Sequence, residues 1–470
     1  MILILNSPNY YSLFLNSLLI TYYSLLSVIF SHESFFPFFD LALNPSHFQF
    51  EVEEDLRLMS QSHRMRKPTL SPERVPDEVV FNILTHLPVK PIIRFRCVSK
   101  SWNSTITAPI FITTHLNHNR AKSSLPNNDY LLYTSQAMYP SSHQQLCVVV
   151  RNSDHTLTEL SRSRSPFCGS HVIGFCNGIY CFFENNNYTI SLWNPSIKKL
   201  KILTPIHIPR YDGMVTHGLV YNSQNNDFKI LRIVFDGVVS GYKVPLPLEA
   251  GVYTWSTDSW KYIDIYMESL CGSGLNASIV DIQEKPFIFV NGALHSMIHT
   301  RGHNFILCFD VNDETFQAIM LPENYLDGLS PDFDQLEQLV VFKGSLALVA
   351  FGRDLYEEHD LCFIWVMTEY GVFDSWTKKT VAVDLVERFF GCTRRGELLI
   401  ETLDTGLVSF DPDSLDQKNL EIQCSPIWLG YSTDFMESLV LLDGVNLSSE
   451  SLVLLDGLNV SSDVSSEYED

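Results

Sequence analysis

The stretch Val75–Ile106 reads VPDEVVFNILTHLPVKPIIRFRCVSKSWNSTI and decides the first part of the fold. Pro76 suits the first turn of a helix, and the acidic residues Asp77 and Glu78 favour the positive end of the helix dipole. Pro88 ends this first helix. The apolar residues between the two prolines recur with the period of a helix rather than that of a strand; they are Val79, Val80, Ile83, Leu84 and Leu87.

Two more short helices are predicted downstream of Pro88. Pro91 opens one that carries Ile92, Ile93 and Phe95, and another begins near Val98 and carries Trp102 and Ile106. Helices of this length are not stable alone, and roughly 45 residues supply little core. The three-helix module must therefore pack against something else, and its excess apolar surface predicts a docking partner.

The same stretch resembles the F-box, whose pattern is a leading Leu-Pro, an acidic residue, a helix ending in Leu-Pro-Val-Lys, and then Arg-Phe-Arg, Val, Lys and Trp. Val75 stands where the family usually has Leu, and Ser99 stands where Cys is common. The matching residues are Pro76, Glu78, Ile83, Leu84, Leu87, Pro88, Val89, Lys90, Arg94, Phe95, Arg96, Val98, Lys100 and Trp102.

The resemblance implies that residues 71–117 form an F-box that binds a Skp-type adaptor and, through it, a cullin-RING ubiquitin ligase. By the same resemblance, the adaptor-binding residues would be Val75, Pro76, Val79, Leu84, Leu87 and Pro88. The core of the F-box would contain Ile83, Phe95, Val98 and Trp102. The alternative interpretation of this stretch is an ordinary helical subdomain.

After Asn117 the chain becomes polar and broken, which predicts a linker and the first β elements over residues 118–166. Helical periodicity then gives way to a repeating unit of short strands and turns. Glycine turns recur at Gly178, Gly292, Gly344 and Gly396, and 344 − 292 and 396 − 344 both equal 52. Repeats of about 50 residues with several strands each are typical of propeller blades.

Hairpins are also predicted along this region, and the first strand of each contains an aromatic residue. The first strands of these hairpins are Ile190–Trp193, Tyr253–Trp255, Leu307–Asp310, Ile364–Met367 and Leu407–Phe410. The segments GFCNGIYCF, WNPSIKKLKILTP, VYTWSTDSWKYI, ILCFDVNDETFQAIMLPE and IWVMTEYGVFDSWTKK resemble the F-box-associated, kelch-like domain of plant F-box proteins. That resemblance extends over Phe167–Leu439, and we assign the domain itself to residues 167–436.

The fold class predicted is mainly β with a small α module: an N-terminal three-helix F-box followed by a β-propeller-like, kelch-type domain. The function that the resemblance implies is substrate recognition for an SCF-type (Skp–cullin–F-box) E3 ubiquitin ligase. The F-box would dock the adaptor, and the β domain would bind an unknown target protein for ubiquitination. Transfer chemistry would occur on other subunits, so we expect a receptor without catalysis or cofactor that acts by proximity.

Composition bounds the partner and the compartment. The chain has 470 residues, 45% of them hydrophobic, and a formal net charge of −22, so it lacks the clustered Lys and Arg that nucleic-acid binding needs. A protein partner is expected instead. Ten cysteines are scattered along the chain without a CxxC pair, and Cys97 and Cys308 lie in apolar runs. Buried thiols in a reducing compartment, the cytoplasm or the nucleus, fit this pattern.

The first 31 residues carry no charged side chain and include an apolar run long enough for a bilayer helix, which takes about 20 residues. No Lys or Arg flanks the run before Arg57, so we interpret residues 1–64 as an extension of a protein that begins near Met59 or Met65. The alternative is a membrane-anchored or secreted β-propeller protein with a binding or hydrolytic function. Five glycosylation triplets would support it, at Asn103, Asn187, Asn276, Asn446 and Asn459.

Motifs for catalysis and metals are weak. The sequence has no Gly-x-Ser-x-Gly, no Gly-x-x-x-x-Gly-Lys and no His-Glu-x-x-His. His115 with His118, and His295 with His299, are interpreted as loop or surface histidines rather than metal ligands. Asp411-Pro-Asp413 is interpreted as a turn rather than a calcium loop. Five tryptophans could stack on a ligand but are assigned to the core; they are Trp193, Trp255, Trp260, Trp365 and Trp376.

The C-terminus contains a duplication. Glu437–Ser449 reads ESLVLLDGVNLSS and Glu450–Ser462 reads ESLVLLDGLNVSS, so the two copies differ only by Val and Leu exchanges. We interpret residues 437–470 as an acidic, flexible tail that adds no blade to the β domain.

Overall fold

The computed structural model describes residues 76–123, 130–135, 143–151, 157–168, 170–184, 188–203, 214–235, 248–265, 270, 279–283, 286–300, 303–331, 335–356, 359–383, 386–403, 405–420, 429–441 and 445–446. Residues 1–64, the predicted extension, lie outside the described part. In the described part, no helix is long and apolar enough to cross a membrane.

The helical module contains α3 (Asp77–Thr85), α4 (Val89–Phe95), α5 (Lys100–Thr107) and α6 (Pro109–Ser123). The prediction of three helices missed α6, and the polar residues 118–123, expected to be linker, form its last turns. Helix α4 begins at Val89, before Pro91. A proline in the first turn lacks only an N–H that has no partner inside the helix, so Pro91 is accommodated there. Ser99 caps α5 by accepting a hydrogen bond from the Trp102 backbone N–H at 3.1 Å.

The β strands follow in chain order. They are β1 (Tyr130–Ser135), β2 (His143–Arg151), β3 (Leu157–Cys168), β4 (His171–Cys176), β5 (Ile179–Glu184), β6 (Thr189–Asn194), β7 (Lys199–Ile202), β8 (Met214–Asn222), β9 (Asp227–Phe235), β10 (Glu249–Thr254), β11 (Ser259–Asp264), β12 (Ile279–Ile282), β13 (Ile288–Val290), β14 (Ala293–Thr300), β15 (Phe305–Asp310), β16 (Thr315–Met320), β17 (Leu336–Phe342), β18 (Ser345–Arg353), β19 (Asp360–Met367), β20 (Trp376–Val383), β21 (Val386–Cys392), β22 (Leu398–Thr402), β23 (Gly406–Phe410), β24 (Gln417–Asn419), β25 (Leu429–Asp434) and β26 (Val445–Asn446). A short 3-10 turn, η2 (Phe373–Ser375), precedes β20.

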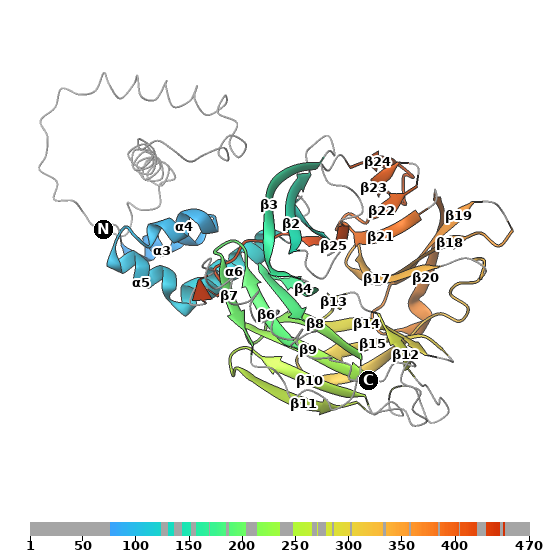
Figure 1. The fold of residues 1–470 in the computed structure, drawn as a ribbon, viewed down its shortest axis with the longest axis horizontal. Helices are drawn as coiled ribbons and strands as arrows, with labels where there is room; N and C mark the ends of the chain where they lie inside the picture. Colours follow the sequence, from blue (N-terminus) through green and yellow to red (C-terminus); the bar gives the residue numbers. More distant parts are fainter. Residues whose placement is uncertain are drawn as a thin grey trace, which may run out of the picture. The chain divides into compact units, whose positions relative to one another are not determined.

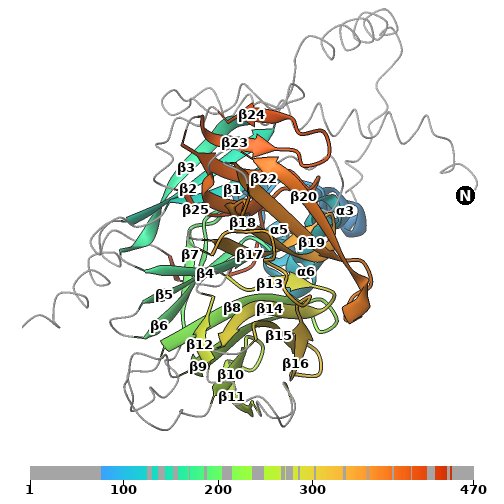
Figure 2. The same ribbon diagram turned by 90° about the vertical axis from the view of Figure 1, so that its right-hand side faces the viewer.

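The described strands form six antiparallel sheets of four or five strands, arranged as a β-propeller (Figures 1 and 2). Most sheets are built from consecutive strands, for example β8 to β11 and β17 to β20. The first sheet is different, because β25, near the C-terminus, pairs with β1 at the start of the domain. Figure 2 shows β25 next to β1. The mainly β, propeller prediction is therefore confirmed, and the ring closes through strands from the two ends of the domain.

The predicted glycine turns connect neighbouring antiparallel strands in four of the described sheets: β4 with β5, β13 with β14, β17 with β18, and β21 with β22. At Gly178, Gly292 and Gly344, the glycine and the residue before it both have positive φ, which is the backbone of a two-residue hairpin turn. The fourth turn differs, because Gly396 has φ +88° while its N–H bonds the Thr393 carbonyl at 2.9 Å. The equal spacing of the last three glycines thus marks three successive sheets.

A second repeated feature is an Asn or Asp that follows an aromatic residue at a strand end. Asn194, Asn222, Asp310 and Asp411 each accept a hydrogen bond through Oδ1 from the backbone N–H two residues on. The side chain thereby folds its own turn. The predicted turn at Asp411 is confirmed, and this aromatic-Asx pattern could have been found from the sequence.

The predicted core role of the five tryptophans is confirmed. Trp193 is buried among Tyr180 and Phe182, and the other four pack against the main clusters between sheets. Cys308 is buried as expected, whereas Cys97 is exposed at the end of α4, contrary to the prediction. Cys97 follows the end of α4, so the apolar residues next to it in the sequence do not cover its thiol in the fold.

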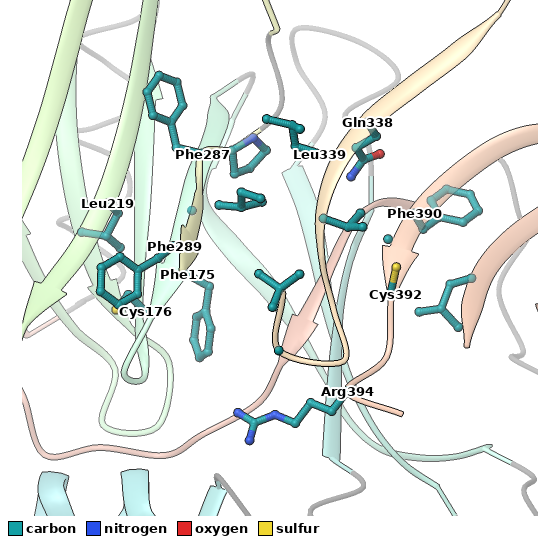
Figure 3. Close-up of a pocket in the computed structure, with 18 of the residues that line it drawn as sticks. Phe175, Cys176, Leu219, Phe287, Phe289, Gln338, Leu339, Phe390, Cys392 and Arg394 are labelled. Atoms are coloured by element: carbon teal, nitrogen blue, oxygen red, sulfur yellow. The ribbon is translucent and has the colours of Figure 1, made fainter. Parts of the chain in front are cut away.

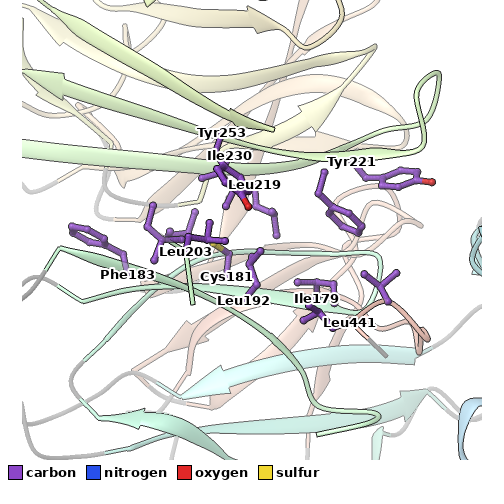
Figure 4. Packing of buried hydrophobic residues seen from close by; sticks show 14 of the residues in the cluster. Ile179, Cys181, Phe183, Leu192, Leu203, Leu219, Tyr221, Ile230, Tyr253 and Leu441 are labelled. Carbon is purple, nitrogen blue, oxygen red and sulfur yellow. The ribbon is translucent and has the colours of Figure 1, made fainter. Parts of the chain in front are cut away.

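Residues 437–441 of the first copy are packed against the domain, which corrects the prediction of a flexible tail for these residues. Leu439 is fully buried in the core of the helical module, and Leu441 lies next to Ile179 in the cluster between the β4–β7 and β8–β11 sheets (Figure 4). Asn194 Nδ2 donates to the carbonyl oxygens of Ser438 at 2.9 Å and Val440 at 2.8 Å. Val445 and Asn446 then pair with β7 as an added edge strand.

Gly178 gives a direct test of this packing. A Cβ on Gly178 would lie 2.6 Å from Ser438 Oγ and 3.0 Å from Ser438 N, whereas a Cβ on Gly292 would meet nothing within 4 Å. Both glycines have nearly the same φ, +82° and +83°, so both variants carry similar backbone strain of about 1 kcal/mol. We expect Gly178→Ala to lower the free energy of unfolding by about 1 to 2 kcal/mol more than Gly292→Ala does. Urea unfolding measures both, and equal losses would contradict the packing of Ser438.

Candidate partner-binding sites

Helix α3 has two apolar faces that meet different surroundings. Leu84 is only 2% exposed and packs with Val89, Ile92 and Phe111, and Val80 and Leu87 pack against the same cluster. The other face carries Pro76, Val79 and Ile83, which are exposed or half-buried and lie outside that cluster. Because residues four apart share a helix face, Val79 and Ile83 form one stripe.

This arrangement differs from the predicted one. Leu84, predicted to bind the adaptor, is buried in the cluster, because the helical period that turns Val80 toward the cluster also turns Leu84 inward. Leu87 packs against the same cluster, whereas Ile83, predicted as a core residue, lies outside it. Val98 is 50% exposed rather than a core residue, since it follows the end of α4. Val75 lies outside the described residues. Pro88 is exposed, and Phe95 and Trp102 pack edge to face with ring centroids 5.4 Å apart.

Helix α4 receives its N-terminal cap from a distant part of the chain. Its N-cap residue, Pro88, makes no side-chain cap, and the Val89 N–H donates instead to Glu437 Oε2 at 3.2 Å. A carboxylate at a helix N-terminus satisfies an unpaired N–H and complements the helix dipole. Burial raises the pKa of the Glu437 carboxyl, and the hydrogen bond from the Val89 N–H offsets part of this rise. Sequence reasoning missed Glu437, because no local pattern joins it to Pro88.

One histidine from each predicted pair is buried against a hydrogen-bond partner. His115 is buried on α6, where Nε2 lies 3.0 Å from the Leu87 carbonyl oxygen, and burial lowers its pKa. It is therefore a core histidine, not a loop or surface one. His295 is also buried, and its Nε2 lies 2.7 Å from Tyr370 Oη. Within the described residues, no group of three or more His, Cys, Asp or Glu side chains could hold a metal ion.

A cavity of about 580 Å³ opens between the first strands of several sheets (Figure 3). Its walls are mostly apolar, and Phe289 is 44% exposed. Other lining residues are Phe175, Cys176, Leu219, Gln338, Leu339, Phe390, Cys392 and Arg394. Burial raises the pKa of Cys176 to about 12 and also raises that of Cys392, so both thiols are protonated near neutral pH and are weak nucleophiles. The cavity therefore offers a largely apolar surface for binding, and neither of these two thiols is activated as a nucleophile.

The chain thus combines a small helical module with a β-propeller. Residues 73–114 match the model of the F-box domain, and residues 130–427 match that of the F-box associated beta propeller domain. The chain therefore belongs to the family of F-box proteins with an F-box associated propeller. Members of this class are in general non-catalytic subunits that recognise substrates for SCF ligases.

Relatives from Arabidopsis thaliana match along most of this chain. F-box protein CPR1 is 26% identical over 387 residues, which cover 78% of this chain and 89% of the relative. An F-box/kelch-repeat protein is 25% identical over 317 residues, which cover 66% of this chain and 79% of the relative. Among solved structures, TolB from Acinetobacter baumannii aligns with a TM-score of 0.38 and 12% identity, over 69% of this chain and 71% of TolB. That last likeness is too slight to carry an inference.

Proposed function

We propose that this chain is the substrate receptor of an SCF-type ubiquitin ligase, and that it docks a Skp-type adaptor through the exposed face of α3. The observation that carries the proposal is the stripe formed by Pro76, Val79 and Ile83. These side chains are apolar, yet the core of the helical module is completed without them by Leu84, Val89, Ile92, Ile106, Phe111 and Leu439. A partner that covers the stripe removes its apolar area from water.

The second half of the proposal concerns the propeller. Its loops and its central cavity would hold a target protein, while the F-box domain holds the adaptor and the rest of the ligase. Two binding sites on one folded unit bring the target close to the ubiquitin-transfer machinery, so the receptor needs no catalytic residue of its own. The largely apolar cavity with Phe289 at its wall supports target binding at this place.

The adaptor site is tested by the double variant Val79→Glu/Ile83→Glu in the full chain. Two carboxylates would be desolvated on docking, so we expect affinity for a purified Skp-type adaptor to fall by about a hundredfold or more. Both side chains are only half-buried in the free chain, so the variant keeps its fold. Surface plasmon resonance measures the affinity, and thermal unfolding checks the fold.

The matched control is Asn82→Glu, which adds a carboxylate to the same helix at an exposed position outside the stripe. We expect the control to bind the adaptor within about twofold of wild type. Wild-type affinity in the double variant would refute docking through this face. Failure of the unaltered chain to bind any Skp-type adaptor would refute the receptor proposal itself.

A further inference from the structure

The seat that holds the first tail copy is built from three parts of the chain. We use "the seat" for the contacts made with Glu437–Leu441 by α4, α6 and the end of β6. The Val89 N–H binds the Glu437 carboxylate, and Asn119 Nδ2 donates to the Glu437 carbonyl oxygen at 3.1 Å. Asn194, itself fully buried, binds the backbone of Ser438 and Val440. The seat therefore joins the helical module to the propeller.

The seat recognises its segment in two ways. The bonds from Asn119 and Asn194 reach backbone oxygens, so any chain in the same conformation can accept them. Specificity comes from side chains: a carboxylate caps α4, Ser438 Oγ lies 3.3 Å from Asn194 Nδ2, and Leu439 fills the core beside Leu84 and Phe111. A second segment with Glu, Ser and Leu in this order would satisfy every one of these contacts.

The chain contains such a segment. Glu450–Leu454 repeats Glu437–Leu441 residue for residue, and Leu458-Asn459 corresponds to the Val445-Asn446 pair of β26. We propose that the seat is a binding site for either copy, and that Glu450–Leu454 occupies it in the same molecule whenever Glu437–Leu441 is displaced. The helical module then stays joined to the propeller through an alternative register of the tail.

The two registers differ in chain connectivity. The first copy follows directly from Met436, which is buried next to the end of β25, whereas seating the second copy closes a loop made of residues 437–449. Closing a loop of that length lowers the equilibrium population by about tenfold to a hundredfold. The first copy is therefore preferred in the wild-type chain. The second copy takes over when the first cannot be seated, since Glu450–Leu454 offers the same side chains in the same order.

The test uses full-length chains and hydrogen exchange of a peptide covering residues 84–95, which includes the capped Val89 amide. Leu439→Asp puts a charge into the apolar core and so displaces the first copy. With the second copy seated, we expect hydrogen exchange of this peptide to be at most about a hundredfold faster than in wild type. The double variant Leu439→Asp/Leu452→Asp has no competent copy, and we expect its exchange to be at least about tenfold faster than that of the single variant.

Two control variants distinguish a change in the register of the tail from a general effect of added charge. Leu452→Asp alone is expected to match wild type within about twofold, because the first copy is in place. Leu439→Asp/Ser465→Asp adds the same charge outside the repeat and is expected to match Leu439→Asp. Equal exchange in the Leu439→Asp and Leu439→Asp/Leu452→Asp chains would overturn the proposal. So would protection in Leu439→Asp that is lost on tenfold dilution, because it would show binding by the tail of another molecule.

Discussion

Replacing Leu84 by glutamate is expected to unfold the helical module rather than to map its binding face. Leu84 is 2% exposed and lies in one cluster with Val89, Ile92, Ile106 and Phe111. The variant loses the apolar contacts of a buried leucine and places an unpaired carboxylate among apolar side chains, which together cost about 4 kcal/mol or more. A module of four short helices cannot absorb such a loss. Helix signal by circular dichroism and hydrogen exchange of residues 77–123 would measure it.

Leu84→Met is the matched control, because methionine keeps the volume and adds no charge. We expect it to cost less than about 1.5 kcal/mol and to leave helix content unchanged. If the Leu84→Glu variant kept a folded helical module, the conclusion that this face of α3 is buried would be wrong. The comparison matters for adaptor binding: loss of binding in Leu84→Glu would report unfolding, whereas the same loss in Val79→Glu/Ile83→Glu reports a contact.

The second large effect is expected at Glu314, which connects two sheets of the propeller. Its Oε1 lies 2.8 Å from Lys229 Nζ, and the Lys229 side chain is only 7% exposed. Lys229 also donates to the Val311 carbonyl oxygen at 2.7 Å. In Glu314→Ala the buried ammonium keeps that carbonyl but loses its counter-ion. Removing one partner of a buried ion pair costs about 3 to 5 kcal/mol, and we expect a loss near the lower end because Glu314 is partly exposed.

Lys261→Ala provides the control, because Lys261 binds the other oxygen of Glu314 at 2.6 Å but is itself 68% exposed. An exposed pair contributes less than about 1 kcal/mol, so urea unfolding should separate the two variants clearly. Equal losses would refute a special role for the buried lysine.

The pH dependence of this site has a definite sign. Desolvation acts to raise the pKa of Glu314, but the hydrogen bonds from Lys229 and Lys261 outweigh it and leave the pKa below its ordinary value. A carboxyl whose pKa is lower in the folded state stabilises the fold above its unfolded pKa. That stabilisation is lost as the pH falls through the folded value, and Glu314→Ala should remove this part of the acid sensitivity.

For this protein the sequence by itself determined the order of parts and the local turns. Prolines and helical periodicity predicted α3 and the break at Pro88, because these effects act within a few residues. Gly178, Gly292 and Gly344 predicted hairpins, since a two-residue turn requires positive φ. The near-50-residue spacing predicted a propeller, and the family comparison confirmed it.

The tertiary structure alone decided which apolar residues are buried in the core and which stay available to a partner. Leu84 and Ile83 are neighbours in the sequence and have similar hydrophobicity. Only the fold shows that Leu84 packs with Phe111 and Leu439 in the core of the helical module, whereas Ile83 lies outside that core. Glu437 caps α4, and β25 pairs with β1, across separations of about three hundred residues or more. No periodic pattern encodes such contacts, because they depend on how the sheets close into a ring.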